Sequence, residues 1–377
     1  MSSTQSKFPS ASREDWHALV SAALKGGDPQ SLDRLDEDGL AIKALYDIAS
    51  YAAASPDACA ITRLPVNPAS HIAHGWDICQ PVMADGSAKD VNRLILDELQ
   101  DGVGTIWLQG LQTADLAGQL PAMMQDVVFA AAGIHLDAGN DVMAQIAAFA
   151  GFAKKADTNL AASRFHANID PFAPAADADL LASALAYFMS ADAGDVPPDM
   201  FRAQGWQWHN QGMTAVQELA YILASLTEIL RQGMARNIDP AHLAKHMSAS
   251  LALPADLFEG IAKCRALRRG WGAIVSALGL DPDAHRLCIH GAVSIRMFST
   301  VDSEVNMLRT TTALLGGAIG GADQLSAHAH NCLTGDDFLG RRLARMQQHL
   351  LIDESGLSRS LDPAGGAGFI EDRTDQL

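Results

Sequence analysis

The sequence predicts an α/β fold, a (β/α)8 TIM barrel preceded by a helical N-terminal arm. From about Trp76 onward, short apolar runs alternate with helical stretches. Such alternation implies β-α-β crossovers and a parallel sheet. About eight units fit into roughly 270 residues, which is the usual size of a TIM barrel. A doubly wound open sheet is the rival architecture that periodicity leaves open.

Composition narrows the class of protein. The 377 residues are 48% hydrophobic and 19% charged, with a formal net charge of −17. A large core is therefore expected, and the charge argues against binding nucleic acid or an anionic membrane. Five scattered cysteines without a CxxC pair predict reduced thiols, with neither a zinc site nor a disulfide scaffold. No apolar run approaches the roughly 20 residues of a membrane span, and no signal core opens the chain, so we expect a cytoplasmic protein.

The chain is expected to divide into four parts. Residues 1–12 form a flexible tail, 13–70 the N-terminal arm, 71–360 the barrel and 361–377 a loop-like tail. The candidate strands are Trp76–Val82, Gly104–Leu108, Asp126–Phe129, Gly133–Leu136, Phe165–Ile169, Met200–Trp206 and Ala292–Phe298.

Three helical features stand out. The clearest amphipathic helix is Met213–Leu230, whose apolar residues recur at i, i+3, i+4 and i+7. Thr334 and Asp337 form an acidic version of a capping box before a helix that runs to Leu350. The paired glycines at 316–317 and 320–321 interrupt an Ala/Leu helix four residues apart, which predicts close helix packing rather than a phosphate loop.

Several segments, taken in order, resemble the methylmalonyl-CoA mutase family, whose members use adenosylcobalamin to rearrange carbon skeletons. LDEDGLAIKALY at 35–46 is similar to the family's entry arm, and GWDICQ at 75–80 to its first barrel strand, "PWxIRQ". GWQWHNQG at 205–212 resembles the "GYHMQEAG" strand and helix. NMLRTTTALLGGAIGGADQL at 306–325 and ARMQQHLLIDESGLSRSLDPAGGAGFIED at 344–372 resemble the end of the barrel. The resemblance covers about residues 30 to 373 and implies a TIM barrel.

Two departures from the family pattern shape the expected function. Catalytic members carry Tyr-His where this chain has Trp206 and Gln207, and their "QTSGWSLT" substrate loop is missing between Ser299 and Asp302. Function on this fold resides in the loops that follow the strands. The resemblance therefore implies the small, non-catalytic subunit of a heterodimeric mutase.

The same reasoning yields candidate site residues. No catalytic residue is expected, and Trp206, Gln207 and His209 are vestigial candidates. Strand alternation would put His209 on the same face as Gln207. Substrate-binding candidates are Gln80, Arg296 and His328.

Neither a cofactor nor a metal ion is expected in this chain. The family binds cobalamin through DxHxxG in a separate domain, whereas Asp283–Cys288 has Cys in place of Gly and lies in the barrel region. We expect no C-terminal cobalamin-binding domain here. His328 and His330 could be read as a metal-binding pair, but no acidic residue or cysteine stands near them at the spacing of a metal ligand. We therefore expect them to belong to a polar segment at the rim of the barrel. Adenosylcobalamin would be bound by a homologous catalytic subunit, and the complex would convert methylmalonyl-CoA to succinyl-CoA.

Two other functions remain open. The barrel could itself be a catalytic acyl-CoA mutase that uses a separately encoded cobalamin-binding subunit, with Gln207, His209 and Arg296 lining the acyl pocket. It could also be a regulatory module that binds CoA esters. The basic residues Arg265, Arg268 and Arg269 are expected on a solvated or ion-paired helix face, or at a subunit contact.

Overall fold

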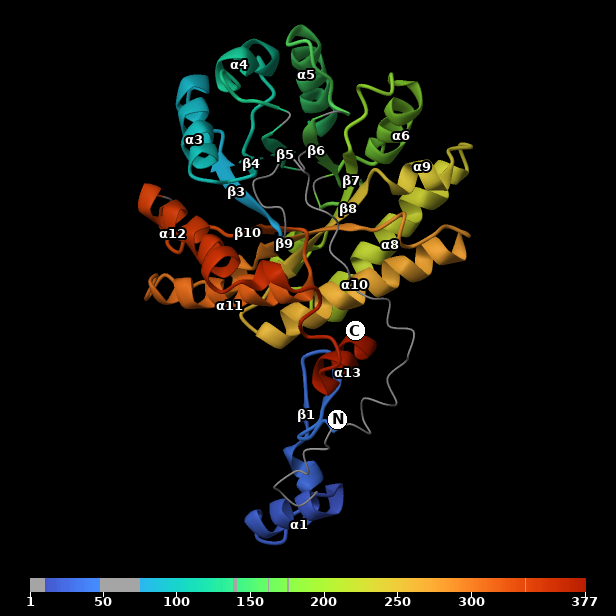
Figure 1. The fold of residues 1–377 in the computed structure, drawn as a ribbon. Helices are drawn as coiled ribbons and strands as arrows, with labels where there is room; N and C mark the ends of the chain where they lie inside the picture. Colours follow the sequence, from blue (N-terminus) through green and yellow to red (C-terminus); the bar gives the residue numbers. More distant parts are fainter. Residues whose placement is uncertain are drawn as a thin grey trace, which may run out of the picture.

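Eight parallel strands close into a barrel (Figure 1). The computed structural model describes residues 11–47 and 75–377, apart from 130, 138–140, 162, 175 and 336. The strands are β3 (Asp77–Met83), β4 (Thr105–Gln109), β5 (Gly133–Leu136), β6 (Arg164–Ile169), β7 (Asp199–Gln204), β8 (Met247–Leu253), β9 (Cys288–Val293) and β10 (Gln324–Ser326). They neighbour one another in chain order, and β10 pairs with β3 to close the ring. The predicted TIM barrel is confirmed, and the open sheet is excluded.

Helices surround the barrel (Figure 1). The larger ones are α3 (Ala88–Gln100), α4 (Leu116–Met123), α5 (Val142–Lys155), α6 (Leu180–Ser190), α8 (Ala215–Met234), α10 (Leu257–Ala277), α11 (Val305–Gly320) and α12 (Phe338–His349), with short helices α7 (Gly205–Asn210) and α9 (Pro240–Ala244) between them. The predicted helix at 213–230 is α8, which begins with a capping box between Thr214 and Gln217. None of the described helices is long and apolar enough to cross a membrane.

Glycines allow α10 and α11 to approach closely. A Cβ on Gly320 would lie 2.9 Å from Cys264 Cβ and 3.0 Å from Ile261 Cα. A Cβ on Gly316 would lie 3.1 Å from the carbonyl oxygen of Leu257. The predicted close packing of this glycine-bearing helix is confirmed.

Several predicted elements were wrong. Residues 126–129 form no strand. The strand predicted at 200–206 ends at Gln204, and Gly205 begins α7. The strand predicted at 292–298 lies earlier, as β9, and Ile295–Met297 is a 3-10 turn. Strands β8 and β10 were missed. The N-cap of α12 is Asp337, which accepts a hydrogen bond from the Gly340 amide, rather than Thr334.

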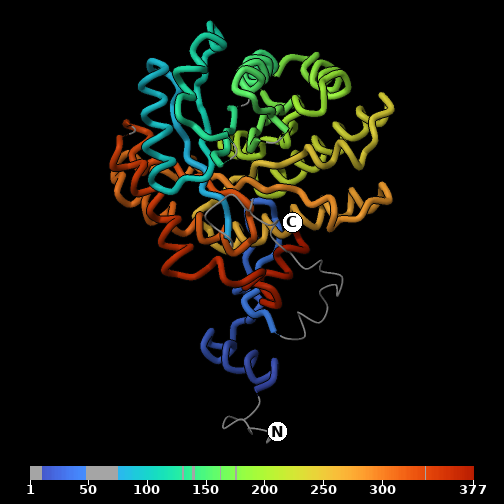
Figure 2. The backbone as a smooth tube through the Cα atoms, turned by 45° about the horizontal axis from the view of Figure 1, so that its top comes forward, coloured from blue at the N-terminus to red at the C-terminus, as the bar shows by residue number. Residues whose placement is uncertain are grey.

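The N-terminal arm combines helix and hairpin. It contains α1 (Arg13–Ala23), a 3-10 turn (Pro29–Leu32) and the strands β1 (Arg34–Leu35) and β2 (Ala41–Ile42). Helix α1 lies away from the barrel in both ribbon and tube views (Figures 1 and 2). The predicted part of the arm at 48–70 lies outside the described residues.

The C-terminal segment is ordered by ion pairs, so its prediction as a loop was wrong. It ends in helix α13 (Gly368–Gln376), which packs on α10 and reaches the hairpin, where the Gln376 amide donates to the Ala41 carbonyl. Arg265 binds Asp362 and Glu371, while Arg373 binds Asp36. Arg268 and Arg269 also contact acids of this chain, Asp323 and Asp375. The ion-paired interpretation of the Arg265 cluster is confirmed.

Candidate functional site

Polar side chains line the inside of the barrel, where most TIM barrels have Val, Ile or Leu. Side chains alternate along a strand, so every second residue faces the axis. The inward residues include Asp77, Cys79, Thr105, Trp107, His135, His166, Arg202, Ser248, Ser250, His290 and Ser326, and all of them are buried. A buried polar interior of this kind marks the axis as the candidate site.

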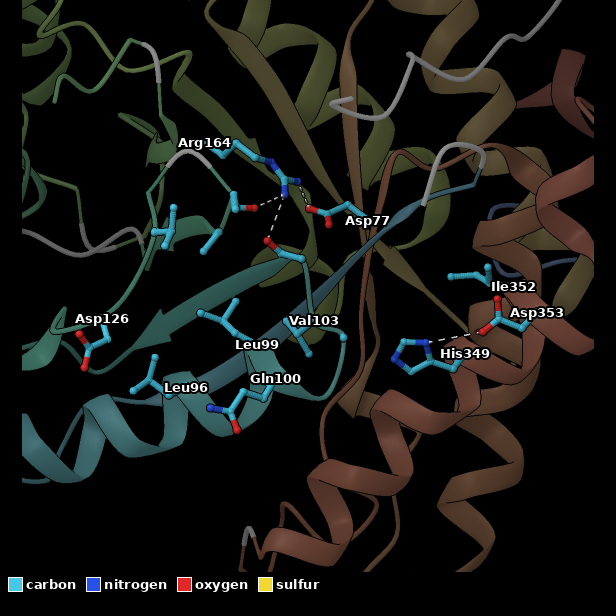
Figure 3. Close-up of a pocket in the computed structure, with 15 residues that line it drawn as sticks. Asp77, Leu96, Leu99, Gln100, Val103, Asp126, Arg164, His349, Ile352 and Asp353 are labelled. Atoms are coloured by element: carbon cyan, nitrogen blue, oxygen red, sulfur yellow. Dashed lines mark hydrogen bonds and ion pairs between the residues drawn. The ribbon is translucent and has the colours of Figure 1, made fainter. Parts of the chain in front are cut away.

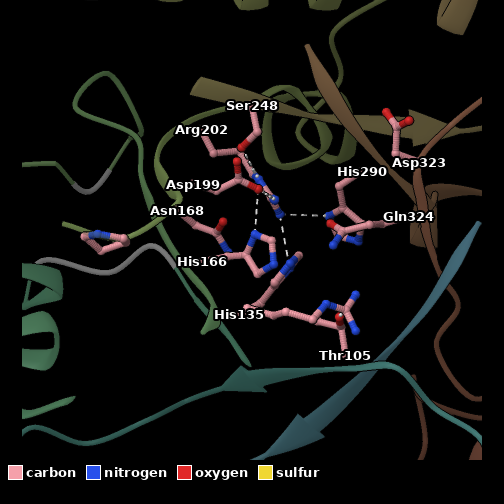
Figure 4. Close-up of polar contacts among 12 residues, drawn as sticks. Thr105, His135, His166, Asn168, Asp199, Arg202, Ser248, His290, Asp323 and Gln324 are labelled. Atoms are coloured by element: carbon pink, nitrogen blue, oxygen red, sulfur yellow. Dashed lines mark hydrogen bonds and ion pairs between the residues drawn. The ribbon is translucent and has the colours of Figure 1, made fainter. Parts of the chain in front are cut away.

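Arg202 lies at the centre of this interior (Figure 4). Its Nη1 is 3.1 Å from His135 Nδ1 and 3.4 Å from His290 Nδ1, and its Nε donates to Ser248 Oγ at 2.9 Å. A guanidinium can only donate, so both imidazoles must accept at Nδ1 and are therefore neutral. His290 Nε2 is then free to donate to Ser326 Oγ, at 2.6 Å.

Burial keeps these histidines neutral. It lowers the pKa of His135 and of His290 well below the ordinary value, and the charge of Arg202 lowers both pKa values further. Burial alone would raise the pKa of Asp199, but His166 and Arg202 outweigh it, so that pKa is lowered. Asp199 lies 2.6 Å from His166 Nδ1 and 3.6 Å from Arg202 Nη2. The central cation is thus balanced by a neighbouring carboxylate, as a buried charge requires.

This cluster does not fit a metal ion. Cys79, His135 and His290 each offer one ligand atom within 4.8 Å of the others. However, Arg202 donates to the imidazole nitrogens on the shared side, where its positive charge would repel a metal cation. The donor set is better suited to holding Arg202.

Three aromatic side chains lie against one another at the carboxyl end of the strands, where TIM-barrel active sites form. The Trp206 indole stacks on His328, with centroids 5.7 Å apart and planes at 9°. It also meets the edge of Trp107 at 5.3 Å, and its Nε1 donates to the Val293 carbonyl at 3.0 Å. Burial lowers the pKa of His328 to about 4, so the ring is neutral at pH 7. We call Trp107, Trp206 and His328 the aromatic plug.

His209 lies on helix α7, so the prediction that strand alternation pairs it with Gln207 was wrong. The ring is buried, with Nε2 3.1 Å from Ser294 Oγ and Nδ1 3.4 Å from Glu218. Glu218 in turn lies 2.6 Å from Lys263 Nζ. His209 therefore belongs to a buried polar network that joins α7 to its neighbours.

The remaining candidates lie apart from the aromatic plug. Arg296 is exposed and donates to the carbonyls of His209 and Met213, which fixes the end of α7. Gln80 shares a strand face with Ile78 and Val82, so it points toward the helices rather than the axis. Its buried Oε1 has no hydrogen-bond partner among the described residues. Of the predicted residues, the structure brings Trp206 and His328 together at the axis.

Sequence reasoning missed the inner cluster around Arg202. The sequence does contain a signal for this cluster, the single arginine Arg202 within the otherwise apolar strand segment MFRA. A charged side chain inside a buried strand needs polar partners, so it indicates a buried polar cluster. His135 and His290 give the same signal in their own strands.

The residues nearest to a cobalamin motif do not fit a cobalt ligand. Asp283 and His285 precede β9, at the end of the barrel opposite the aromatic plug. His285 Nδ1 lies 3.0 Å from the Asp281 carbonyl, and Asp283 accepts from Arg286 at 2.8 Å. Both side chains are therefore engaged in local turn contacts, and we assign no cobalamin contact to them.

Fold and site together define a TIM-barrel protein with a polar axis that its own side chains fill. Comparison with known proteins supplies the family. The model of the family described as methylmalonyl-CoA mutase matches residues 169–377, more than half of the chain. The chain belongs to the methylmalonyl-CoA mutase family.

Curated relatives extend the match. The "Methylmalonyl-CoA mutase small subunit" of Streptomyces virginiae is 30% identical over 394 residues, covering 100% of this chain and 63% of the relative. The "Probable methylmalonyl-CoA mutase small subunit" of Mycobacterium bovis is 31% identical, covering 95% of this chain and 60% of the relative. "Methylmalonyl-CoA mutase" of Escherichia coli is 31% identical over 176 residues, covering 46% of this chain and 24% of the relative. The chain thus spans about three fifths of the length of the small subunits it matches.

Proposed function

We propose that this chain is the small, non-catalytic subunit of a heterodimeric mutase that interconverts methylmalonyl-CoA and succinyl-CoA. Its partner would be a homologous catalytic subunit that binds adenosylcobalamin. The names of the small-subunit relatives support the partnership. The observation that carries the non-catalytic role is the aromatic plug, which occupies the end of the barrel where a substrate would react.

The plug is held by the barrel itself. Trp206 is tied to β9 through the Val293 carbonyl and is stacked on His328, which follows β10. Trp107 contributes from β4 and packs with Cys79 and Ala292. Admitting an acyl group here would expose large aromatic surfaces, each burying about 150–250 Å², and would break the indole hydrogen bond. The barrel is therefore better suited to support a partner than to enclose a substrate.

Below the plug, Arg202 fills the axis and donates hydrogen bonds to His135, His290 and Ser248. Hydrogen bonds between buried side chains are stronger than those in water, and they hold these side chains in one arrangement. In the proposed complex, the partner's adenosylcobalamin supplies the radical chemistry when bound. The residues of this chain would keep its barrel in one shape against the catalytic subunit.

Reconstitution tests this function. The chain is purified with a catalytic mutase subunit from the same organism, and succinyl-CoA formation is measured with adenosylcobalamin. We expect the two to co-purify and the pair to be active. Gln207→Ala in this chain should leave kcat/KM within about twofold, because Gln207 would contact no substrate.

The same assay tests the catalytic alternative. Activity of this chain with a cobalamin-binding protein that has no barrel of its own would refute the non-catalytic role. Failure to co-purify with a catalytic subunit would refute the partnership.

A further inference from the structure

A cavity of about 640 Å³ opens at the amino end of the strands, between α3 and α12 (Figure 3). The acid at its floor, Asp77, is bound by Arg164 and Thr105, and the Gly104 backbone closes off its other oxygen. Asp77 therefore has nothing to offer a ligand. Elsewhere at the same end of the barrel, two imidazoles remain open to one.

His242 and His246 stand four residues apart on one side of a short helix. His242 lies in α9, and Lys245, just beyond the last residue of that helix, keeps helical backbone angles, φ −70° and ψ −16°. Side chains four residues apart in a helix are neighbours on one face, and the two ring centroids are 5.1 Å apart. Two histidines at this spacing can bind one metal ion, as they do in helical zinc sites.

The hydrogen bond of His246 settles which of its nitrogens is available. Nδ1 lies 2.7 Å from the Pro197 carbonyl oxygen, which can only accept, so Nδ1 carries the proton and Nε2 keeps its lone pair. Metal-binding histidines are oriented in the same way, by donating their second nitrogen to a carbonyl or a carboxylate. Nε2 of His246 has no hydrogen-bond partner among the described residues, and unlike the unpartnered nitrogens at the barrel axis it is open to solvent.

His242 completes the pair from the solvent side. It is exposed, and its ring meets the rings of His246 and Phe188. Phe188 of α6 is buried and lies 5.1 Å from each imidazole, centroid to centroid, so it supports both rings on one side. The imidazole of His242 makes no hydrogen bond within the described part of the chain, so it can turn a nitrogen toward an ion without breaking one.

The separation of the two rings fits a single ion. Bonds from a metal to an imidazole nitrogen are about 2.0–2.1 Å long, which puts an ion about 3.2 Å from each ring centroid. At coordination angles of about 90–109°, the two centroids would then be about 4.5–5.2 Å apart. The observed 5.1 Å lies within this range.

Charge and donor type select the ion. The chain carries −17, which attracts cations, and the intervening Lys245 is exposed, so its ammonium can stay in solvent. Imidazole nitrogens suit Cu²⁺, Ni²⁺ and Zn²⁺, whereas Mg²⁺ and Ca²⁺ prefer oxygen ligands. Among the residues that the structure describes, no third histidine, cysteine or acid joins the pair, so water would occupy the remaining positions around the ion.

We propose that His242 and His246 form a site for a divalent transition-metal ion, bound through Nε2 of His246 and one ring nitrogen of His242, with water as the other ligands. The ion clips the turn between α9 and β8 in the folded chain. The expectation from sequence that the chain holds no metal ion took account of the cysteines and of His328 and His330, and not of this pair. The site is separate from the proposed mutase partnership and does not depend on it.

Calorimetry with NiCl₂, CoCl₂ and MgCl₂ tests the ligand class on the full chain without a histidine tag. We expect one saturable Ni²⁺ site per chain, weaker binding of Co²⁺ as the Irving–Williams order requires, and no saturable binding of Mg²⁺. Because the site exists only in the folded chain, Ni²⁺ should also raise the urea midpoint of unfolding. No saturable Ni²⁺ binding below about 1 mM, or Mg²⁺ binding of equal strength, would overturn the proposal.

Matched variants test the location. His246→Asn keeps a donor toward the Pro197 carbonyl and loses Nε2, and His242→Asn removes the exposed partner, whose replacement should not affect folding. Each should weaken Ni²⁺ binding at least about tenfold, since even the outer partners of metal ligands are worth that much. His17→Asn is the control and should leave binding unchanged, because α1 has no second histidine four residues away. Unchanged Ni²⁺ affinity in His242→Asn, or an equal loss in His17→Asn, would place the ion elsewhere and refute the site.

Discussion

Lys263→Met removes one partner of a fully buried ion pair behind the barrel mouth. Lys263 Nζ lies 2.6 Å from Glu218 Oε2 and 2.9 Å from the Ala252 carbonyl oxygen, and both side chains of the pair are inaccessible to solvent. Methionine keeps most of the length of lysine and loses the charge. Glu218 would then be buried without its strongest counter-charge.

The size of the effect follows from the cost of protonating Glu218. Burial tends to raise the pKa of this carboxyl, but Lys263 and His209 outweigh burial and the pKa is lowered. Without Lys263 the carboxyl must take a proton. From an ordinary value of 4.5 to pH 7 this costs about 3.4 kcal/mol, at 1.36 kcal/mol per pH unit. Losing the donor to the Ala252 carbonyl adds about 1 kcal/mol, which gives about 4 kcal/mol at pH 7.

The effect must also depend on pH. In the variant the folded carboxyl stays protonated, whereas the unfolded one ionises above its ordinary pKa of 4.5, so the penalty grows as the pH rises above that value. The penalty for Lys263→Met should therefore shrink by about 2.7 kcal/mol between pH 7 and pH 5, two pH units at 1.36 kcal/mol each.

Urea unfolding of the wild type and the variant at both pH values measures this. Lys154→Met is the matched control, because its ion pair with Asp195 lies at the surface with the lysine 59% exposed. It should change the free energy of unfolding by less than about 1 kcal/mol. A penalty below about 1 kcal/mol for Lys263→Met at pH 7, or one that does not change with pH, would refute the reasoning.

Three further outcomes are expected. Gly320→Ala should lower the free energy of unfolding by about 1–3 kcal/mol, because the new methyl group would meet Cys264 and Ile261. Gly151→Ala is the control in the same urea titration. Its methyl group would have no heavy atom within 4 Å, so it should stabilise α5 by up to about 1 kcal/mol. His328 should titrate near pH 4 by NMR. Since its folded pKa is lowered, it should reduce stability as the pH falls from about 6.5 toward 4, and titration near pH 6.5 would contradict its burial. Trp206→Ala should cost about 2–3 kcal/mol and change the fluorescence of Trp107, and a silent substitution would mean that the plug does not pack as described.

Apolar periodicity predicted the barrel better than its individual strands. The strands with apolar runs, such as β5 and β6, lie close to their predicted positions. Strand β8 was missed because MSASLAL alternates Ser and Ala, with the serines directed at a polar axis. β10 has three residues, too few for a recognisable pattern. A polar interior thus hides strands from any method that relies on apolar residues.

The errors at the termini and in α7 have another cause. Helix α13 carries three glycines just before or at its start, and its order depends on ion pairs to Arg265 and Asp36, far away in the sequence. For GWQWHNQG, local propensity did not distinguish a strand end from a short helix, so His209 was placed on the wrong face. Trp206 and His328 were identified from sequence. Their stacking depends on the closed barrel, which brings the segments after β7 and β10 together, and it could not be predicted from either segment alone.

The number of substrate sites in the reconstituted pair tests the central claim most directly. Equilibrium dialysis of succinyl-CoA against the purified complex of this chain with the proposed catalytic subunit gives that number. A barrel mouth closed by Trp107, Trp206 and His328 predicts one site per pair, held by the partner, and no succinyl-CoA bound to this chain alone. The account would be contradicted by two succinyl-CoA sites per pair, one of which is lost when Trp206→Arg is made in this chain. That result would show that the barrel of this chain binds substrate.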